Sequence, residues 1–146
     1  MEKIKEFVAQ FTEKFDFSNI QVIKERYFLA DKSVNDVKNK IKDLPYSVGV
    51  FLGEKRKEFF PSPALIDLIS KKSSRKVIVN KKAEFLFLCG RDVLDSGIGK
   101  CTYTDGLVLV QNSKDENLGY GEVDSTENKL IIKNILDKGA YLRMER

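Results

Sequence analysis

Histidine is missing from the sequence of 146 residues. Its absence excludes Ser-His and Cys-His catalysis, histidine acid–base chemistry and every histidine-containing zinc site. Only two cysteines are present, Cys89 and Cys101, and two thiols can neither close a structural zinc site nor build a disulfide framework. We therefore expect both cysteines to be reduced and to serve as small hydrophobic residues in or near a core.

Long hydrophobic runs are also missing. No apolar stretch approaches the ~18 residues that a membrane helix needs, and the charged start MEKIKEF lacks the apolar segment of a secretory signal. The remaining composition, with 42% hydrophobic and 33% charged residues, is that of an ordinary globular protein. We expect a cytoplasmic protein that has no membrane partner.

A strong excess of one charge is lacking too, because the net charge is only +4. Any binding of nucleic acid must therefore come from local clusters of cations. The clearest cluster has six cations and no acid; it consists of Lys71, Lys72, Arg75, Lys76, Lys81 and Lys82. A solvated linker next to the end of a strand would have the same composition.

The first half of the chain alternates between helix and strand patterns. Apolar residues at helical spacing from Ile4 to Phe15 predict an N-terminal helix. Short strands are expected at 21–25, 27–30 and 47–52. The first half is thus predicted to be a mixed α/β segment.

Two further helices are predicted from their start signals. Ser33 is expected to cap a helix that ends before Pro45, and Ser62-Pro63 is expected to open another. Ser73-Ser74 follows as the clearest boundary in the chain. We therefore predict an N-terminal domain over residues 1–74 and a second domain over 75–146.

The second half has the glycine spacing of a small barrel. Residues alternate as strands at 76–80 and 129–135. Between them, the apolar run from Phe85 to Cys89 ends at a glycine, and the glycine-containing segments SGIG and LGYG flank the run GLVLVQN. Glycine is favoured where a backbone bends or approaches closely, so this spacing predicts short, sharply bent strands.

Two glycine motifs begin like nucleotide-binding loops and fail on spacing. Around Gly97–Lys100, Leu94 stands where a phosphate loop needs its first glycine, and Cys101 stands where it needs Ser or Thr. After Gly119–Gly121, Asp124 takes the place of the third glycine of a dinucleotide fingerprint. We expect no cofactor and no small-molecule substrate.

One pair of carboxylates, Asp92 and Asp95, has the spacing of one helical turn. Without a histidine nearby, we interpret the two as charges at a helix N-terminus rather than as an acid–base couple. No catalytic residue is therefore predicted.

Cations surround the glycine turn Gly97–Gly99. Arg91 and Lys100 bracket it. Further cations recur along the last strands and near the chain end, at Lys129, Lys133, Lys138 and Arg143. Exposed backbone groups and cations of this kind hold phosphates, so the pattern favours RNA over plain solubility.

The motifs CGRDVL, SGIG, GLVLVQN and LGYG, closing with KNILDKGAYLR, resemble a PUA domain, a small RNA-binding β-barrel. The upstream stretch YSVGVFLGEKRKEFFPSPALIDLI is similar to the segment before the PUA domain in large-subunit ribosome-assembly factors of the Nip-seven type, in their archaeal branch. The resemblance implies an α+β protein, with an N-terminal α/β domain packed on a C-terminal PUA-type β-barrel.

The same resemblance implies function. It implies a non-catalytic RNA-binding adaptor in ribosome biogenesis that acts in rRNA processing and large-subunit assembly. The implied partners are ribosomal RNA precursors and proteins of ribosome assembly or RNA degradation. The family's RNA contacts, carried to this chain, fall on Arg91, Gly97, Lys100, Lys129, Lys133, Lys138 and Arg143.

Two alternatives remain open at this point. PUA domains often accompany RNA-modifying catalytic domains, but residues 1–74 contain no histidine, no cysteine and no cofactor loop. The other alternative is a translation-associated PUA protein that acts on the small ribosomal subunit. Association with large-subunit precursors or with initiation complexes would distinguish the assembly factor from this second alternative.

Overall fold

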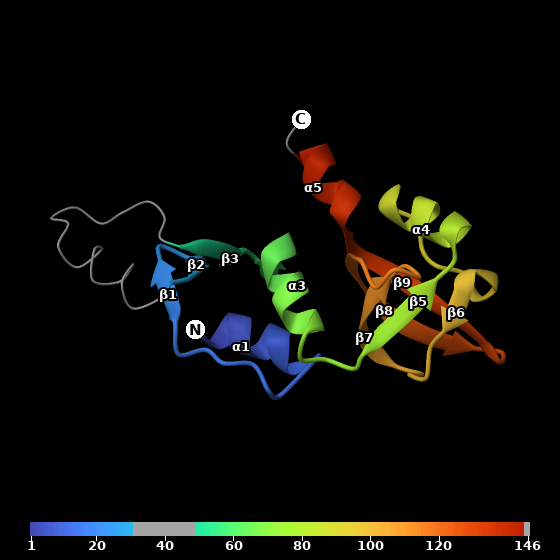
Figure 1. Cartoon of the computed structure of the whole chain (residues 1–146), viewed down its shortest axis with the longest axis horizontal. Helices are drawn as coiled ribbons and strands as arrows, with labels where there is room; N and C mark the ends of the chain where they lie inside the picture. The colour runs from blue at the N-terminus through green and yellow to red at the C-terminus, as the bar shows by residue number, and fades with distance from the viewer. Residues whose placement is uncertain (31–48, 145–146) are drawn as a thin grey trace, which may run out of the picture. The chain divides into compact units, whose positions relative to one another are not determined.

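The computed structural model describes residues 1–30 and 49–144 (Figure 1). The chain forms two compact units, Met1–Lys72 and Ser73–Arg146. The domain boundary at residue 74 stays a prediction. The packing of one domain on the other stays a prediction too.

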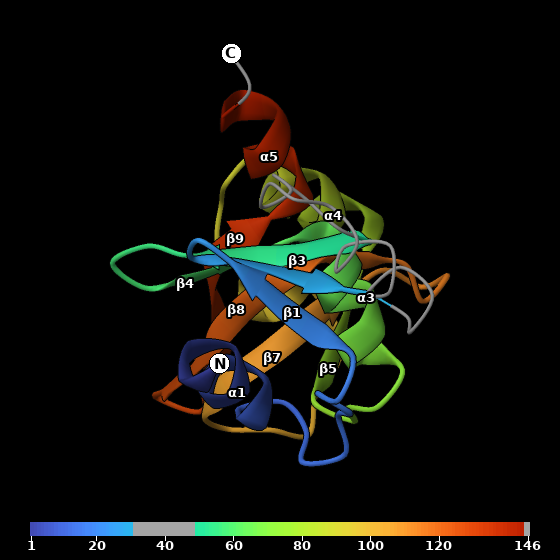
Figure 2. The same ribbon diagram turned by 90° about the vertical axis from the view of Figure 1, so that its left-hand side faces the viewer.

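The described part of the first unit is a four-stranded antiparallel sheet with helices (Figure 2). The strands are hydrogen-bonded in the order β1-β2-β3-β4. The elements are α1 (Glu2–Ala9), β1 (Ile20–Ile23), β2 (Arg26–Leu29), β3 (Val50–Lys55), β4 (Phe59–Pro61) and α3 (Pro63–Ser70). The predicted strands at 21–25 and 27–30 are thus present with shifted ends.

The N-terminal helix is shorter than predicted. The chain leaves the helix after Ala9, where Phe11 N and Thr12 N both donate to Val8 O. Phe11 is still buried, but Phe15 lies beyond the helix and its ring packs on Phe17 with centroids 4.9 Å apart. The apolar spacing therefore reports burial in this segment and does not mark the helix end.

The helix start predicted at Ser62-Pro63 is confirmed. Ser62 Oγ accepts a hydrogen bond from Leu65 N at 3.1 Å, and Pro63 occupies the first helical position. Strand β3 is described from Val50, after Gly49 with φ +67°, and residues 47 and 48 of the predicted strand lie outside the described residues. The helix predicted from Ser33 lies outside the described residues.

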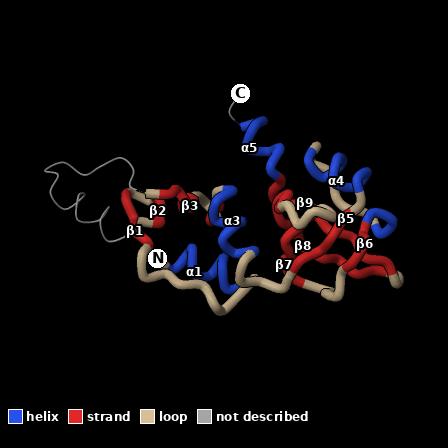
Figure 3. The backbone as a smooth tube through the Cα atoms, in the orientation of Figure 1, coloured by secondary structure: helices blue, strands red, loops and turns tan. Residues whose placement is uncertain are grey.

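The described part of the second unit is a curled, five-stranded half-barrel with two α-helices and a short 3₁₀ helix (Figure 3). Its strands are ordered β6-β5-β7-β8-β9, and only the pair β5–β7 is parallel. The elements are β5 (Lys76–Val79), α4 (Lys81–Leu88), the short helix η1 (Asp95–Gly97), β6 (Ile98–Lys100), β7 (Gly106–Gln111), β8 (Asn117–Thr126), β9 (Lys129–Asp137) and α5 (Lys138–Met144). Buried side chains from β5, α4, β7, β8 and β9 form its core.

The apolar run at 85–89 is helical, which contradicts the predicted strand. Its helix α4 places Ala83 and Phe87 in the core and leaves Phe85 67% exposed. Short apolar runs do not distinguish helix from strand. Cys89 is exposed at the end of this helix, so its predicted place in or near the core is wrong.

Cys101 is half-buried and packs against the core of the second unit, as predicted. Both cysteines are free thiols. In the part of the chain that the structure describes, no helix has the length and apolar character needed to cross a membrane.

Candidate functional site

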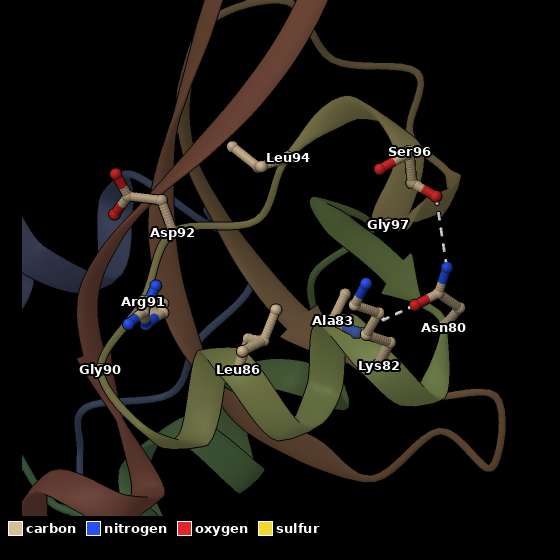
Figure 4. A pocket seen from close by; sticks show the side chains of 10 residues that line it. All are labelled: Asn80, Lys82, Ala83, Leu86, Gly90, Arg91, Asp92, Leu94, Ser96 and Gly97. Atoms are coloured by element: carbon tan, nitrogen blue, oxygen red, sulfur yellow. Dashed lines mark hydrogen bonds between the residues drawn. The ribbon is translucent and has the colours of Figure 1, made fainter.

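A pocket of about 510 Å³ lies between α4 and the segment that follows it (Figure 4). Lys82, Ala83 and Leu86 line it from α4. The opposite wall is the segment from Gly90 to Gly97. Both walls belong to the second unit.

Asn80 joins the two walls at the helix start. Its side-chain Oδ1 accepts from Ala83 N at 2.9 Å and so caps α4, while its Nδ2 donates to Ser96 O at 3.2 Å. Its backbone N also donates to Gly97 O at 3.0 Å. One residue therefore fixes the helix N-terminus and the far end of the pocket wall.

We expect Asn80→Ala to lower the free energy of unfolding by about 1 kcal/mol, because the cap of α4 is lost. Asn80→Asp keeps the oxygen that accepts from Ala83 N but cannot donate to Ser96 O. It therefore tests the hydrogen bond between the two pocket walls separately from the helix cap. Thermal and urea unfolding measures both variants. An Asn80→Ala protein as stable as the parent would contradict the capping role.

The near end of the wall is held by the last turn of α4. Gly90 N donates to Phe87 O at 2.9 Å, and Arg91 N donates to Leu86 O at 3.0 Å. Asn134 on β9 holds the same turn, because its Nδ2 donates to Phe87 O at 2.9 Å and to Arg91 O at 3.3 Å. The backbone that carries Arg91 is therefore fixed from two sides.

The middle of the wall runs along β9 and forms hydrogen bonds with the backbone groups at the edge of this strand. Val93 and Ile132 exchange two backbone hydrogen bonds, of 2.8 and 2.9 Å. On either side, Asp92 Oδ1 accepts from Asn134 N at 2.9 Å and Asp95 Oδ1 accepts from Leu130 N at 3.1 Å. Alternate N–H groups of an exposed strand edge are thus paired, which protects the edge.

These contacts correct the interpretation of the two carboxylates. Asp92 precedes η1 and lies in no helix, and Asp95 opens only this three-residue 3₁₀ helix. Both side chains instead bind the backbone of β9. Their role is to attach the pocket wall to the sheet.

The pocket surface combines cations with apolar groups. Lys82 and Arg91 are exposed, and neither forms an ion pair with another described residue. Leu94 lies 61% exposed beside them, and Asp92 is the one acid of the lining. Such a surface suits a ligand that carries both anionic and flat apolar parts. Among the described residues, no group of His, Cys, Asp and Glu could hold a metal ion.

Residues 75–146 match the family described as the UPF0113 PUA domain. The second unit of this chain is therefore similar to that family.

Relatives extend the likeness beyond the PUA domain. A UPF0113 protein from Archaeoglobus fulgidus is 30% identical over 112 residues, which cover 70% of this chain and 64% of that protein. The match thus spans slightly less than two thirds of that relative. A protein of Danio rerio named 60S ribosome subunit biogenesis protein NIP7 homolog is 28% identical over 132 residues, which cover 82% of this chain and 73% of that protein.

A solved structure of a conserved PUA domain protein from Thermoplasma acidophilum has the same fold. It superimposes with a TM-score of 0.52 at 16% identity, covering 94% of this chain and 89% of that one. The mixed α and β fold class and the resemblance predicted from the sequence are confirmed.

Within the residues that match the PUA-domain family, the predicted site residues do not gather at one place. Arg91 and Gly97 belong to the pocket. The other five lie on three elements: Lys100 ends β6, Lys129 and Lys133 are on β9, and Lys138 and Arg143 are on α5. Their RNA-binding role stays a prediction.

Gly97 is needed for packing. It is buried, its φ is not positive, and an added Cβ would lie 2.6 Å from Ala83 Cβ. Its N donates to Leu94 O and its O accepts from Asn80 N. Glycine here lets η1 approach α4, which corrects the predicted open turn.

Two of the predicted cations have carboxylate partners. Arg143 Nη2 lies 3.1 Å from the buried Asp137, and Arg143 Nη1 donates to Leu88 O. Lys133 Nζ lies 3.5 Å from Asp124 in an exposed pair. Arg143 therefore has a clear structural task.

Sequence reasoning missed Asn80 as a site residue and placed Lys82 only in the broad basic cluster. An N-cap signal was present, because Asn precedes the helix start and serves well in that position. The apolar run at 85–89, which is also typical of a strand, hides this signal.

Proposed function

We propose that this protein is a non-catalytic RNA-binding factor of ribosome biogenesis, and that its PUA domain binds RNA at the pocket between α4 and the Gly90–Gly97 segment. The single observation that carries the proposal is the pair of exposed cations, Lys82 and Arg91, on opposite walls of this pocket in a PUA domain. PUA domains are small RNA-binding barrels, and the name of the relative from Danio rerio refers to 60S ribosome subunit biogenesis.

The two cations would contact phosphate oxygens, because Lys and Arg supply most protein contacts to a nucleic-acid backbone. Leu86 and Leu94 would lie against the flat faces of unpaired bases. The backbone of the Gly90–Gly97 wall is already held in place before RNA binds, since it is hydrogen-bonded to α4 and β9. Binding would then cost little ordering of the protein.

The biological partners follow the same line. We infer that the RNA is a precursor of large-subunit ribosomal RNA, and that the protein works in the cytoplasm with other assembly or RNA-degradation proteins. Recovery of the tagged chain with large-subunit precursor particles supports this inference. Recovery with initiation complexes of the small subunit overturns it.

The pocket is tested by removing its two cations. We expect Lys82→Gln with Arg91→Gln to weaken binding of single-stranded RNA about tenfold at low salt and to reduce the log–log salt slope by about 1.4, which corresponds to two lost phosphate contacts. Fluorescence anisotropy across a series of salt concentrations measures both quantities. Circular dichroism checks that the variant is folded.

Lys114→Gln is a matched control in the same domain, because Lys114 is exposed on the turn between β7 and β8 and lies outside this pocket. It should change affinity little. The pocket proposal fails when the control and the double variant lose the same affinity, or when neither loses any. Lys100, Lys129, Lys133 and Lys138 can be scanned in the same way.

A further inference from the structure

One end of the sheet in the first unit carries an excess of cations. It comprises the turn between β1 and β2 and the hairpin between β3 and β4 (Figure 2). We call it the turn end, and define it as residues 24–26 and 54–58. The two parts are neighbours, since Arg26 on β2 lies opposite Glu54 on β3 in the strand register, and Lys55 N donates to Glu25 O at 2.7 Å.

The turn end holds the whole net charge of the described part of the first unit. It contains five cations and three carboxylates, whereas the rest of residues 1–30 and 49–72 contains five of each. Lys24, Lys55 and Lys57 are exposed and form no ion pair with another described residue. The cations therefore make a local positive surface, which is what a polyanion detects.

The turn that presents Lys24 is strained. Lys24 and Glu25 both have positive φ, of 48° and 38°. Neither is glycine or asparagine, so each residue pays roughly 1–2 kcal/mol for this conformation. A common type of two-residue hairpin turn requires positive φ at both positions, and here it fixes a lysine at the tip of the turn.

Two arginines at the turn end are held against aromatic rings. Arg56 Cζ lies 4.1 Å from the centroid of Phe60, and the same guanidinium is ion-paired with Glu54. Arg26 Cζ lies 4.7 Å from the centroid of Phe51. Stacking on Phe60 positions Arg56 before a ligand arrives, which suits phosphate recognition, whereas Nε and Nη1 of Arg26 are buried.

We propose that the turn end is a second RNA-binding surface, which holds the phosphate backbone through Lys24, Lys55 and Lys57, with Arg56 fixed beside them. This inference rests on the proposed function and extends it to the first unit. The contacts are to phosphates and carry no sequence specificity, because lysines on a turn offer only a charge.

The test uses the full chain, with Lys55→Gln and Lys57→Gln combined. Long single-stranded RNA should bind about fivefold more weakly at low salt, and the log–log salt slope should fall by about 1.4. RNA too short to occupy more than the pocket of the PUA domain should bind as it does to the parent. Lys3→Gln with Lys14→Gln is the matched control, because both lysines are exposed in the same unit outside the turn end.

The outcomes separate this inference from the proposed function. If the parent does not bind RNA, the proposed function fails. If Lys82→Gln with Arg91→Gln weakens RNA binding but the turn-end variant equals its control, only the second surface is wrong. Loss of poly-glutamate binding or of binding to phosphatidylserine vesicles, with RNA binding and its salt slope unchanged, would likewise overturn it in favour of a protein or membrane ligand.

Discussion

Replacing Gly119 by alanine should lower the free energy of unfolding by about 3 kcal/mol or more, through backbone strain and overpacking together. Gly119 lies in β8 with φ +146°, a conformation that L side chains rarely adopt. An added Cβ would lie 2.0 Å from Leu136 O and 2.8 Å from Asp137 Cα. These are backbone atoms of the paired strand β9, so they cannot move aside as a flexible side chain would.

Urea unfolding followed by circular dichroism measures this loss. Gly99→Ala is the matched control, since Gly99 has no positive φ and its added Cβ would come no closer than 3.3 Å to a neighbouring atom, Ile78 O. We expect that control to cost less than about 1 kcal/mol. Equal stability of Gly119→Ala and the parent would mean that β9 moves away from β8 at little cost, which would contradict the tight β8–β9 approach.

Much of the fold can be predicted from the sequence where local signals decide. Ser62-Pro63 starts α3 because a hydroxyl cap and a proline at the first position act within one turn. The alternation at 76–80 and 129–135 marks β5 and β9, because one face of each strand is buried. Glycine spacing correctly indicates a bent sheet, since Gly119 and Gly121 both lie close to β9.

Helix α4 could not be predicted as readily. Five apolar letters in a row describe a buried strand as well as a helix. The structure buries Phe87 and exposes Phe85, and this alternation follows helical spacing from Ala83. The choice of helix over strand depends on the cap at Asn80 and on the packing of α4 on the sheet. Neither can be recognised from residues 85–89 alone.

The site was only partly predictable for the same reason. Arg91 is predicted because it brackets the glycine turn with a second cation, and the structure places it in the pocket wall, but its RNA-binding role stays a prediction. The anchoring of Asp92 and Asp95 is not predicted, because their partners on β9 lie 42 and 35 residues further along the chain. Gly97 looks like an open turn until its contact with Ala83 is known. The charged residues of the wall can be recognised from the local sequence, but their hydrogen bonds to β9 depend on pairing between distant residues.

Helix α5 depends on one buried carboxylate, that of Asp137, at the end of β9. Asp137 is 1% exposed and its oxygens accept from Ala140 N at 2.9 Å, from Asn134 Nδ2 at 3.1 Å and from Arg143 Nη2 at 3.1 Å. Arg143 also reaches Leu88 O, at 2.9 Å, and thereby joins α5 to α4. Burial raises the pKa of Tyr141 in this helix, and the charges of Tyr120 and Asp137 raise it to a smaller extent.

We expect Asp137→Ala to lower the free energy of unfolding by about 3 kcal/mol, because it leaves several donors, one of them cationic, without their buried acceptor. Asp137→Asn should lose less, since an amide oxygen can still cap α5 at Ala140 N. Chemical unfolding gives the energies, and faster amide exchange in residues 138–143 would show that α5 detaches first.

Asp124→Ala is the matched control, because Asp124 also faces a cation, Lys133, but in a pair that is exposed and 3.5 Å long. Exposed pairs of this kind contribute roughly 0–1 kcal/mol. A large difference between the two variants assigns the stability to burial and to the number of hydrogen bonds, not to the presence of an ion pair. Equal losses would show that the Asp137 contacts are as weak as a surface pair, and that α5 is held by its apolar packing instead.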